Sequence, residues 1–283
     1  MTALTESAHV THLRGIQPFD ILRGRYVRQR FAPHLHETFA LGAIEHGAAR
    51  ASYGNDEFVH VAGDVLIIKP NQVHTGEPVD SDGWSYRMFY IPVELMAVCV
   101  DIEGEIPRFA RASYHDPDMA ARIVRAHRFL EGDDDALVKE QVLTEMLYDL
   151  CARYRDDQPA AQTPVPNASL ARVRDYLHEH YAEPVCLADL SKVAGVSAFH
   201  LIRVFRSAFG LPPYAYLELI RVNRAKEMLQ QGARISDVAF ATGFSDQSHL
   251  TRRFKRVFGY PPGRYVRSYW NGAAETRSKR RRF

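Results

Sequence analysis

The strongest constraint on this chain is a pattern of residues that occurs twice in its second half. Leu187–Ser197 is matched by Ile235–Ser245 at an offset of 48 residues. Seven further matches, within Leu201–Tyr216 and Leu250–Tyr265, follow at an offset of 49. A period of this length indicates two copies of one supersecondary unit. The second copy has gained one residue at the start of its second helix, where insertions are easily absorbed.

Each copy carries the signals of a helix-turn-helix, namely a short helix, a tight turn and a longer helix. The signals are a glycine in the turn (Gly195, Gly243), a serine N-cap (Ser197, Ser245) and a glycine after the last turn (Gly210, Gly259). Serine is favoured at an N-cap because its hydroxyl accepts a backbone N–H that the helix leaves unpaired. The sequence therefore predicts two helix-turn-helix units.

The longer helix of each copy separates an apolar face from an outward face, at about 100° per residue. The apolar faces, expected to be buried, hold Leu201, Val204, Phe205, Ala208 and Phe209 in the first copy and Leu250, Phe254, Val257 and Phe258 in the second. The outward faces hold Phe199, Ile202, Arg203 and Arg206 in the first copy and Gln247, Ser248, Thr251, Arg252 and Lys255 in the second. Arginine can bond guanine, glutamine can bond adenine, and apolar side chains can touch a thymine methyl group.

Between the copies, Pro213 to Gln230 is predicted to form one helix, with proline at its start and Gly232 just past its end. Its length of about 27 Å approaches the roughly 34 Å that separates successive major-groove faces. One chain could therefore place both longer helices on the same side of a duplex.

The charge is distributed unevenly between the two halves. Residues 1–167 carry a net charge of −9 and residues 168–283 a net charge of +11. The Pro- and Ala-rich stretch 156–167 between them is interpreted as a linker, and 271–283 as a basic tail. A basic domain of this kind is typical of polyanion binding, because each neutralised phosphate releases condensed counterions.

The repeated motifs also resemble a known family. Ala194–Ser197, Arg203–Phe205, Gly243–Ser245, Leu250–Phe254 and Gly259–Pro262 together are similar to the DNA-binding domain of AraC/XylS transcriptional regulators. The resemblance covers nearly the whole of 168–270. It implies a ligand-responsive, sequence-specific regulator of transcription, an activator that acts as a homodimer and contacts RNA polymerase. It also implies base contacts by Phe199, Ile202 and Arg203 in the first unit and by Gln247, Ser248 and Arg252 in the second.

The acidic half is predicted to begin as a β domain. Short apolar runs separated by turn signals occupy 25–31, 39–45, 48–53, 58–61, 65–68 and 84–91. Such spacing favours an antiparallel sandwich or barrel. Helices are expected over 118–131 and 135–155, where apolar residues recur at helical spacing. The predicted fold class is α+β with two domains: a cupin-like antiparallel β-barrel with following helices (1–155), and an all-α double helix-turn-helix (168–270).

Two segments resemble cupin motifs: Pro33–Glu37, which contains His34 and His36, and Gly63–His74. Three imidazoles could bind a metal. The acidic ligand of metal-binding cupins is missing, however, so the sequence favours no metal and no cofactor. We expect His34, His36 and His74 to anchor a small-molecule effector, together with Trp84, Tyr86 and Arg87. The remaining interpretation is that these histidines only cap loops.

Arg87 lies within an apolar strand and needs a partner if it points inward. An anionic group of the effector would suit its planar guanidinium, and a salt bridge to Glu37 or Glu45 would serve equally well. No nucleophile triad, P-loop or dinucleotide fingerprint is present in the sequence, so no catalytic residue and no enzymatic activity are predicted.

The expected partners are double-stranded DNA and a small-molecule effector, with no membrane. No apolar stretch reaches the roughly 18 residues of a membrane span, and no secretory signal is apparent, so we expect a cytoplasmic protein. Two alternatives remain open. One is a metal-dependent cupin enzyme fused to a DNA-binding module, and the other is a ligand-independent architectural DNA-binding protein.

Overall fold

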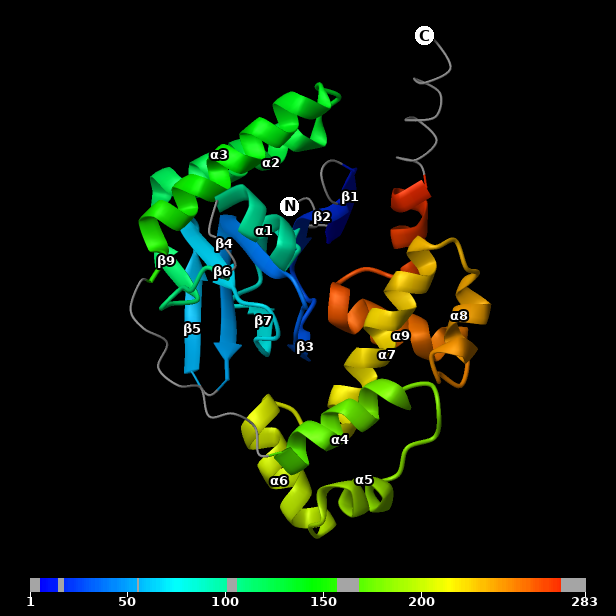
Figure 1. Ribbon diagram of the computed structural model, residues 1–283. Coiled ribbons are helices and arrows are strands. Elements are labelled where there is room, and N and C mark those ends of the chain that lie inside the picture. The colour runs from blue at the N-terminus through cyan, green and yellow to red at the C-terminus, as the bar shows by residue number, and fades with distance from the viewer. Residues whose placement is uncertain (1–5, 15–17, 55, 101–105, 157–167, 271–283) are drawn as a thin grey trace. The chain divides into compact units, whose positions relative to one another are not determined.

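The computed structural model describes residues 6–14, 18–54, 56–100, 106–156 and 168–270 (Figure 1). The chain divides into two compact units. The first comprises residues 1–31, 35–158 and 268–283, and the second comprises residues 159–267 together with the short segment 32–34. The predicted linker, apart from Asp156, and the predicted tail 271–283 lie outside the described residues. No helix in the described part of the chain combines the length and hydropathy that a membrane crossing requires.

The first unit is built on one antiparallel sheet. Its strands are β1 (Ser7–Arg14), β2 (Pro18–Tyr26), β3 (Phe31–His34), β4 (Phe39–Tyr53), β5 (Asp56–Val61), β6 (Asp64–Ile68), β7 (His74–Pro78), β8 (Trp84–Ile91) and β9 (Ser113–His115). The main path runs β1-β2-β8-β4-β6-β9, while the second half of β4 pairs with β5 and β7, and β7 also pairs with β3. Within the described residues the sheet is not closed into a barrel, so the fold class is as predicted except for the barrel.

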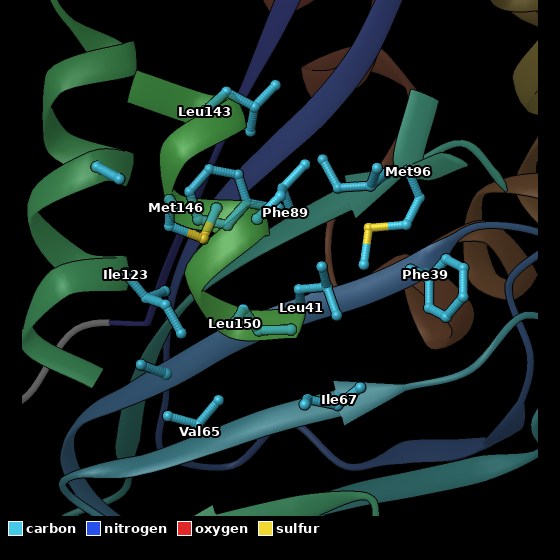
Figure 2. Packing of buried hydrophobic residues seen from close by; sticks show 14 of the residues in the cluster. Phe39, Leu41, Val65, Ile67, Phe89, Met96, Ile123, Leu143, Met146 and Leu150 are labelled. Carbon is cyan, nitrogen blue, oxygen red and sulfur yellow. The ribbon is translucent and has the colours of Figure 1, made fainter. Parts of the chain in front are cut away.

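Three helices cover one face of this sheet: α1 (Val93–Val100), α2 (Pro117–Glu131) and α3 (Ala136–Tyr154). The shared core contains Phe39, Leu41 and Phe89 from the strands, together with Ile123 and Leu150 from the helices (Figure 2). Because strand residues alternate between faces, Tyr90, which follows Phe89, and Tyr86, three residues before it, lie on the opposite face of the sheet. That opposite face carries the candidate effector residues Trp84 and Tyr86, whereas Arg87 lies on the face toward the helices.

Every regular element within residues 168–270 is a helix. The helices are α4 (Ala168–Glu179), α5 (Leu187–Ala194), α6 (Ala198–Phe209), α7 (Pro213–Gln230), α8 (Ile235–Ala241) and α9 (Gln247–Phe258), and residues 262–270 are helical as well. The first helix-turn-helix packs on α4 and α7 through one buried cluster, which includes Val173, Leu201, Phe205 and Leu217. The second packs through a ring cluster that includes Phe254 and Tyr265, whose ring centroids are 5.9 Å apart.

Candidate nucleic-acid interface and effector site

The first helix-turn-helix consists of α5, a turn at Gly195 and α6. Gly195 has φ +70°, in the left-handed region that side chains with a Cβ rarely adopt, so a glycine suits this turn. The hydroxyl of Ser197 accepts the backbone N–H of His200 at 3.4 Å and caps α6, as predicted. Helix α6 therefore begins directly after the turn, with its first turn capped by Ser197.

The outward face of α6 is exposed as predicted. Phe199 is 81% exposed and Ile202 38% exposed, and Arg203 and Arg206 also lie at the surface. Leu201 and Phe205 are fully buried, but Ala208 is exposed, so its assignment to the buried face is wrong. Phe209, the next residue, does pack against the buried cluster, so the apolar face still reaches the end of α6.

The second helix-turn-helix differs from the first at its cap. Asp246, rather than the predicted Ser245, is the N-cap of α9, and its carboxylate accepts the N–H of His249 at 2.7 Å. Ser245 instead donates its hydroxyl to the Asp246 carboxylate at 3.0 Å. These hydrogen bonds hold the pKa of Asp246 below its usual value. The one-residue insertion accounts for the change, because it moves the cap one position along the chain.

The outward face of α9 carries most of the predicted polar residues. Gln247, Ser248, Arg252 and Lys255 are exposed, whereas Thr251 is half-buried. Arg256, which the sequence analysis missed, is also exposed one helical turn after Arg252. Its i+4 spacing from Arg252 was the available signal.

Helix α7 connects the two helix-turn-helix motifs through specific polar contacts. The buried guanidinium of Arg221 donates to the carbonyls of Tyr181 and Glu183 at 2.7 and 2.9 Å, which fixes the loop before α5. Glu218, also on α7, pairs with Arg253 of α9 at 2.9 Å. Both helix-turn-helix units are thus attached to the same helix.

The three histidines predicted to act together do lie together. His34, His36 and His74 are buried, and each offers a ring nitrogen within 4.8 Å of those of the other two. The pairing of β3 with β7 brings His34 and His74 to adjacent strands.

An aromatic cluster occupies the same region of the first unit. The rings of Trp84 and Tyr86 stack at 4.6 Å, and Tyr26 lies 5.1 Å from Phe31. Among the described residues, the buried indole N–H of Trp84 has no hydrogen-bond acceptor. Since a buried donor without an acceptor is costly, this N–H is suited to an acceptor atom of a bound effector.

Tyr90 links the aromatic cluster to the histidines. It follows Trp84 and Tyr86 on the same face of β8, and its ring lies 5.0 Å from that of His36. Burial raises the pKa of the Tyr90 hydroxyl well above its usual value. Sequence reasoning missed Tyr90, although the two-residue alternation along the strand could have indicated it.

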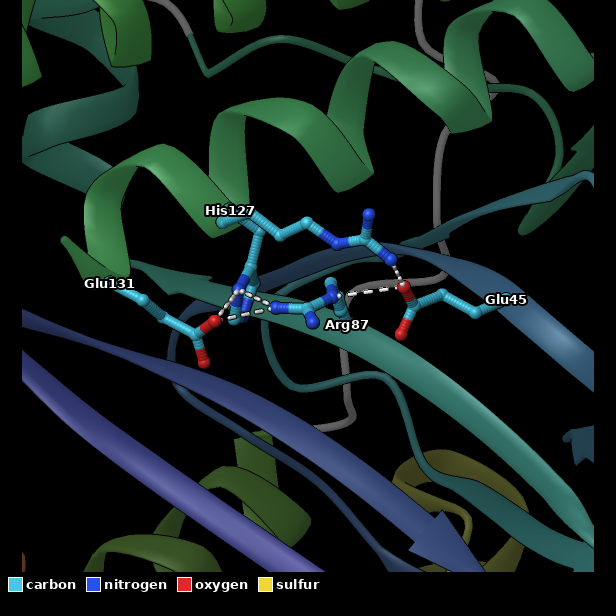
Figure 3. A network of polar contacts seen from close by, with 5 residues as sticks. Glu45, Arg87, His127 and Glu131 are labelled. Carbon is cyan, nitrogen blue, oxygen red and sulfur yellow. Dashed lines mark hydrogen bonds and ion pairs between the residues drawn. The ribbon is translucent and has the colours of Figure 1, made fainter.

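Arg87 lies on the opposite face of the sheet, toward the helices, because it directly follows Tyr86 on β8. Its Nε lies 3.1 Å from the Glu45 carboxylate, and its Nη1 lies 2.7 Å from Glu131 and 3.0 Å from His127 Nδ1 (Figure 3). The salt bridge to Glu45 was one of the two predicted alternatives. Burial and the positive charge of Arg87 lower the pKa of His127 to about 3. The structure gives Arg87 two carboxylate partners from the protein itself.

Two family models match the chain. An AraC-like ligand binding domain matches residues 17–147, and a helix-turn-helix domain matches residues 190–268. The matched ranges coincide with the sheet-and-helix unit and with the two helix-turn-helix motifs.

Similar proteins agree with these domains. The chain is 34% identical to the uncharacterized HTH-type transcriptional regulator YbfI of Bacillus subtilis, over 81% of this chain and 84% of that protein. It is 22% identical to the HTH-type transcriptional activator RhaS of Citrobacter koseri, over 84% and 88%. A crystal structure of wild-type ToxT from Vibrio cholerae with a bound unsaturated fatty acid shares the fold, with a TM-score of 0.53, 14% identity, and coverage of 94% and 96%. The chain belongs to the AraC family of ligand-binding transcriptional regulators.

Proposed function

We propose that the chain reads DNA with the outward faces of α6 and α9. The observation that carries this proposal is the exposure of both faces on helices that are attached to one connecting helix, α7. Phe199, Ile202 and Arg203 contact bases in the first groove, and Gln247, Ser248 and Arg252 do so in the second. The remaining outward residues, Arg206, Thr251, Lys255 and Arg256, bind phosphates.

The effector occupies the sheet face that carries His34, His36, His74, Trp84 and Tyr86. The buried indole N–H of Trp84 and the surrounding aromatic rings support an organic ligand with at least one acceptor atom. Arg87 is not assigned to this site, because two carboxylates already neutralise it. Residues 1–155 form the sensing domain, 156–167 the linker, 168–270 the DNA reader and 271–283 a basic tail.

The regulator acts as a homodimeric activator that contacts RNA polymerase in the cytoplasm and has no catalytic role. The name of its relative RhaS, a transcriptional activator, supports activation rather than repression. Effector binding must favour one arrangement of the protein over another in order to change DNA binding.

The test is a selection of genomic fragments by the purified full chain at about 0.15 M salt, where non-specific electrostatic binding is weakened. Sequencing of the retained DNA should give one enriched motif. The double variant Arg203→Ala/Arg252→Ala should lose that enrichment, while Arg172→Ala, which removes an exposed charge on α4 of the same unit, should retain it. Retention of DNA without a shared motif would overturn the proposal and favour an architectural protein.

A further inference from the structure

We propose that His34, His36 and His74 together bind one divalent transition-metal ion and leave one coordination position open. The three buried imidazoles offer ring nitrogens within 4.8 Å of one another, and tetrahedral coordination at about 2.0–2.1 Å from an ion would draw these nitrogens to about 3.3–3.4 Å apart. Imidazole suits zinc, copper, iron and nickel. The site lies in the sensing unit, on the face opposite the helices.

Hydrogen bonds fix which nitrogen two of the histidines can offer. His34 Nδ1 lies 2.8 Å from the carbonyl oxygen of Ala32, and His74 Nδ1 lies 2.9 Å from that of Gln72. A carbonyl oxygen only accepts, so both Nδ1 atoms carry the proton and both rings keep their lone pair on Nε2. An N–H bonded to a backbone carbonyl is the usual support of a metal-bound histidine.

The loop that carries His74 is tied to the segment that carries His36. Asn71 adopts φ +61° in this loop, and its backbone N–H donates to the carbonyl of His36 at 2.7 Å. Lys69 and Gln72 close the same loop through two hydrogen bonds of 3.1 Å. The ligands are therefore held in place by the surrounding backbone, which is what a preorganised metal site requires.

Two tyrosine rings border the cluster. The rings of Tyr90 and Tyr53 lie 5.0 Å from His36 and 6.4 Å from His74. No carboxylate belongs to the cluster among the described residues, so three neutral imidazoles leave the ion with its full charge. Because three-histidine sites keep their fourth position for an exchangeable ligand, the missing acidic residue is compatible with an open site. Water, hydroxide or an anionic oxygen fits that position.

The experiment measures metal binding by the full chain after treatment with a chelator and dialysis. Titration with zinc chloride alone should give one ion per chain, by calorimetry and by elemental analysis. Cobalt(II) should give the intense visible absorption of a four-coordinate ion. His36→Gln and His74→Gln should each weaken binding by about 100-fold or more. His60→Gln, which alters a buried histidine outside the cluster, should retain the wild-type affinity.

Two results would overturn the proposal. One is the absence of stoichiometric zinc binding by the wild-type chain at micromolar concentrations, which does not depend on any variant folding. The other is equal zinc affinity of His36→Gln and His60→Gln, with both variants shown to be folded by circular dichroism. Neither result bears on DNA reading, which the fragment selection tests separately.

Discussion

At the scale of single residues, the two reading helices differ in chemistry. The exposed face of α6 is partly apolar, with Phe199 and Ile202, whereas that of α9 begins with Gln247 and Ser248 and continues to Arg252. On the proposed function, hydrogen-bonded base recognition would therefore be concentrated on α9.

Arg252→Ala should weaken binding to the selected site by about 1–3 kcal/mol and relax specificity at one base pair. The reason is the loss of a two-bond contact with guanine. Binding assays on the selected site and on its single-base variants measure this effect, with Arg172→Ala as the control. Equal weakening on every DNA sequence would instead assign Arg252 to a phosphate.

Arg87→Met should lower the free energy of unfolding by about 3–5 kcal/mol, because it leaves the carboxylates of Glu45 and Glu131 without their shared cation. Arg122→Met removes an exposed arginine that pairs with Asp149 and should cost about 0–1 kcal/mol. Urea unfolding measures both. Similar losses in the two variants would argue against a structural role for Arg87.

The sensing unit should lose stability as the pH falls below about 6.5, the ordinary pKa of histidine. His127 has a pKa of about 3 when folded, so between these values the unfolded chain binds a proton that the folded chain does not. From pH 7.5 to 5.5 this linkage should cost about 1 kcal/mol. His127→Gln should show a smaller loss in urea unfolding over the same range. An unchanged pH dependence in the variant would contradict this assignment.

The sequence predicted the members of the histidine cluster but not the neutralisation of Arg87 by two carboxylates. Local motifs identify His34, His36 and His74, and strand pairing then brings them together. Glu131 comes from α2, far along the chain, and no local pattern indicates that it meets Arg87. Long-range pairs of this kind depend on tertiary packing.

At the scale of helices and strands, the turns of the two helix-turn-helix units are chemically unequal. Gly195 and Gly243 both have positive φ, but a Cβ on Gly195 would meet no atom within 4 Å. A Cβ on Gly243 would lie 2.9 Å from the carbonyl oxygen of Ala182 and 3.0 Å from the Arg221 guanidinium. The second turn therefore requires glycine for its packing as well as for its conformation.

Gly195→Ala should cost about 1–2 kcal/mol from backbone strain alone. Gly243→Ala should cost about 1–3 kcal/mol more, because the methyl group must displace packed atoms. Thermal and urea unfolding of both variants measure the difference. Equal losses of unfolding free energy would show that the atoms around Gly243 can move to accept a methyl group at no measurable cost.

Elements with strong periodicity were predicted well, and weakly patterned ones were missed. The helix over Pro213–Gln230 is confirmed at both ends, because proline begins it and Gly232 follows it closely. β7, with the sequence HTGEP, and α1 were not predicted. A strand that contains glycine and proline lacks local β propensity, and pairing with β3 and β4 stabilises it. The expected strand over 25–31 was also wrong, since it spans the end of β2 and the start of β3.

At the scale of the whole molecule, α7 fixes the distance between the two reading helices within the second unit. Glu218 pairs with Arg253 on one side, and Arg221 holds the loop before α5 on the other. The spacing of the two contacted DNA segments should be equally fixed.

Insertion of about 5 base pairs between the two segments of the selected site should reduce affinity to that of one helix-turn-helix, because it rotates one segment by about half a turn. Insertion of about 10 base pairs should also fail, because it restores the rotation but lengthens the span by roughly 34 Å. Fluorescence anisotropy on the three DNA duplexes measures this. Full affinity on either insertion would contradict a rigid connection through α7.

The order of the two domains and their fold class followed from charge and repetition, whereas the open sheet did not. Closure of a sheet depends on the pairing of its end strands, and the path here ends at β1 and β9. The residues of these two strands do not indicate whether each strand pairs with one other strand or with two.

The unlike outward faces of α6 and α9 give the bound protein a direction. A reader with two identical helices fits its site equally well in either orientation, but this chain presents Phe199 and Ile202 on one helix and Gln247 and Ser248 on the other. If both faces read DNA as proposed, the site that one chain contacts must be non-palindromic. Reversing that site in place would exchange which helix-turn-helix unit lies nearer to the promoter, so the orientation of the DNA sequence itself carries regulatory information.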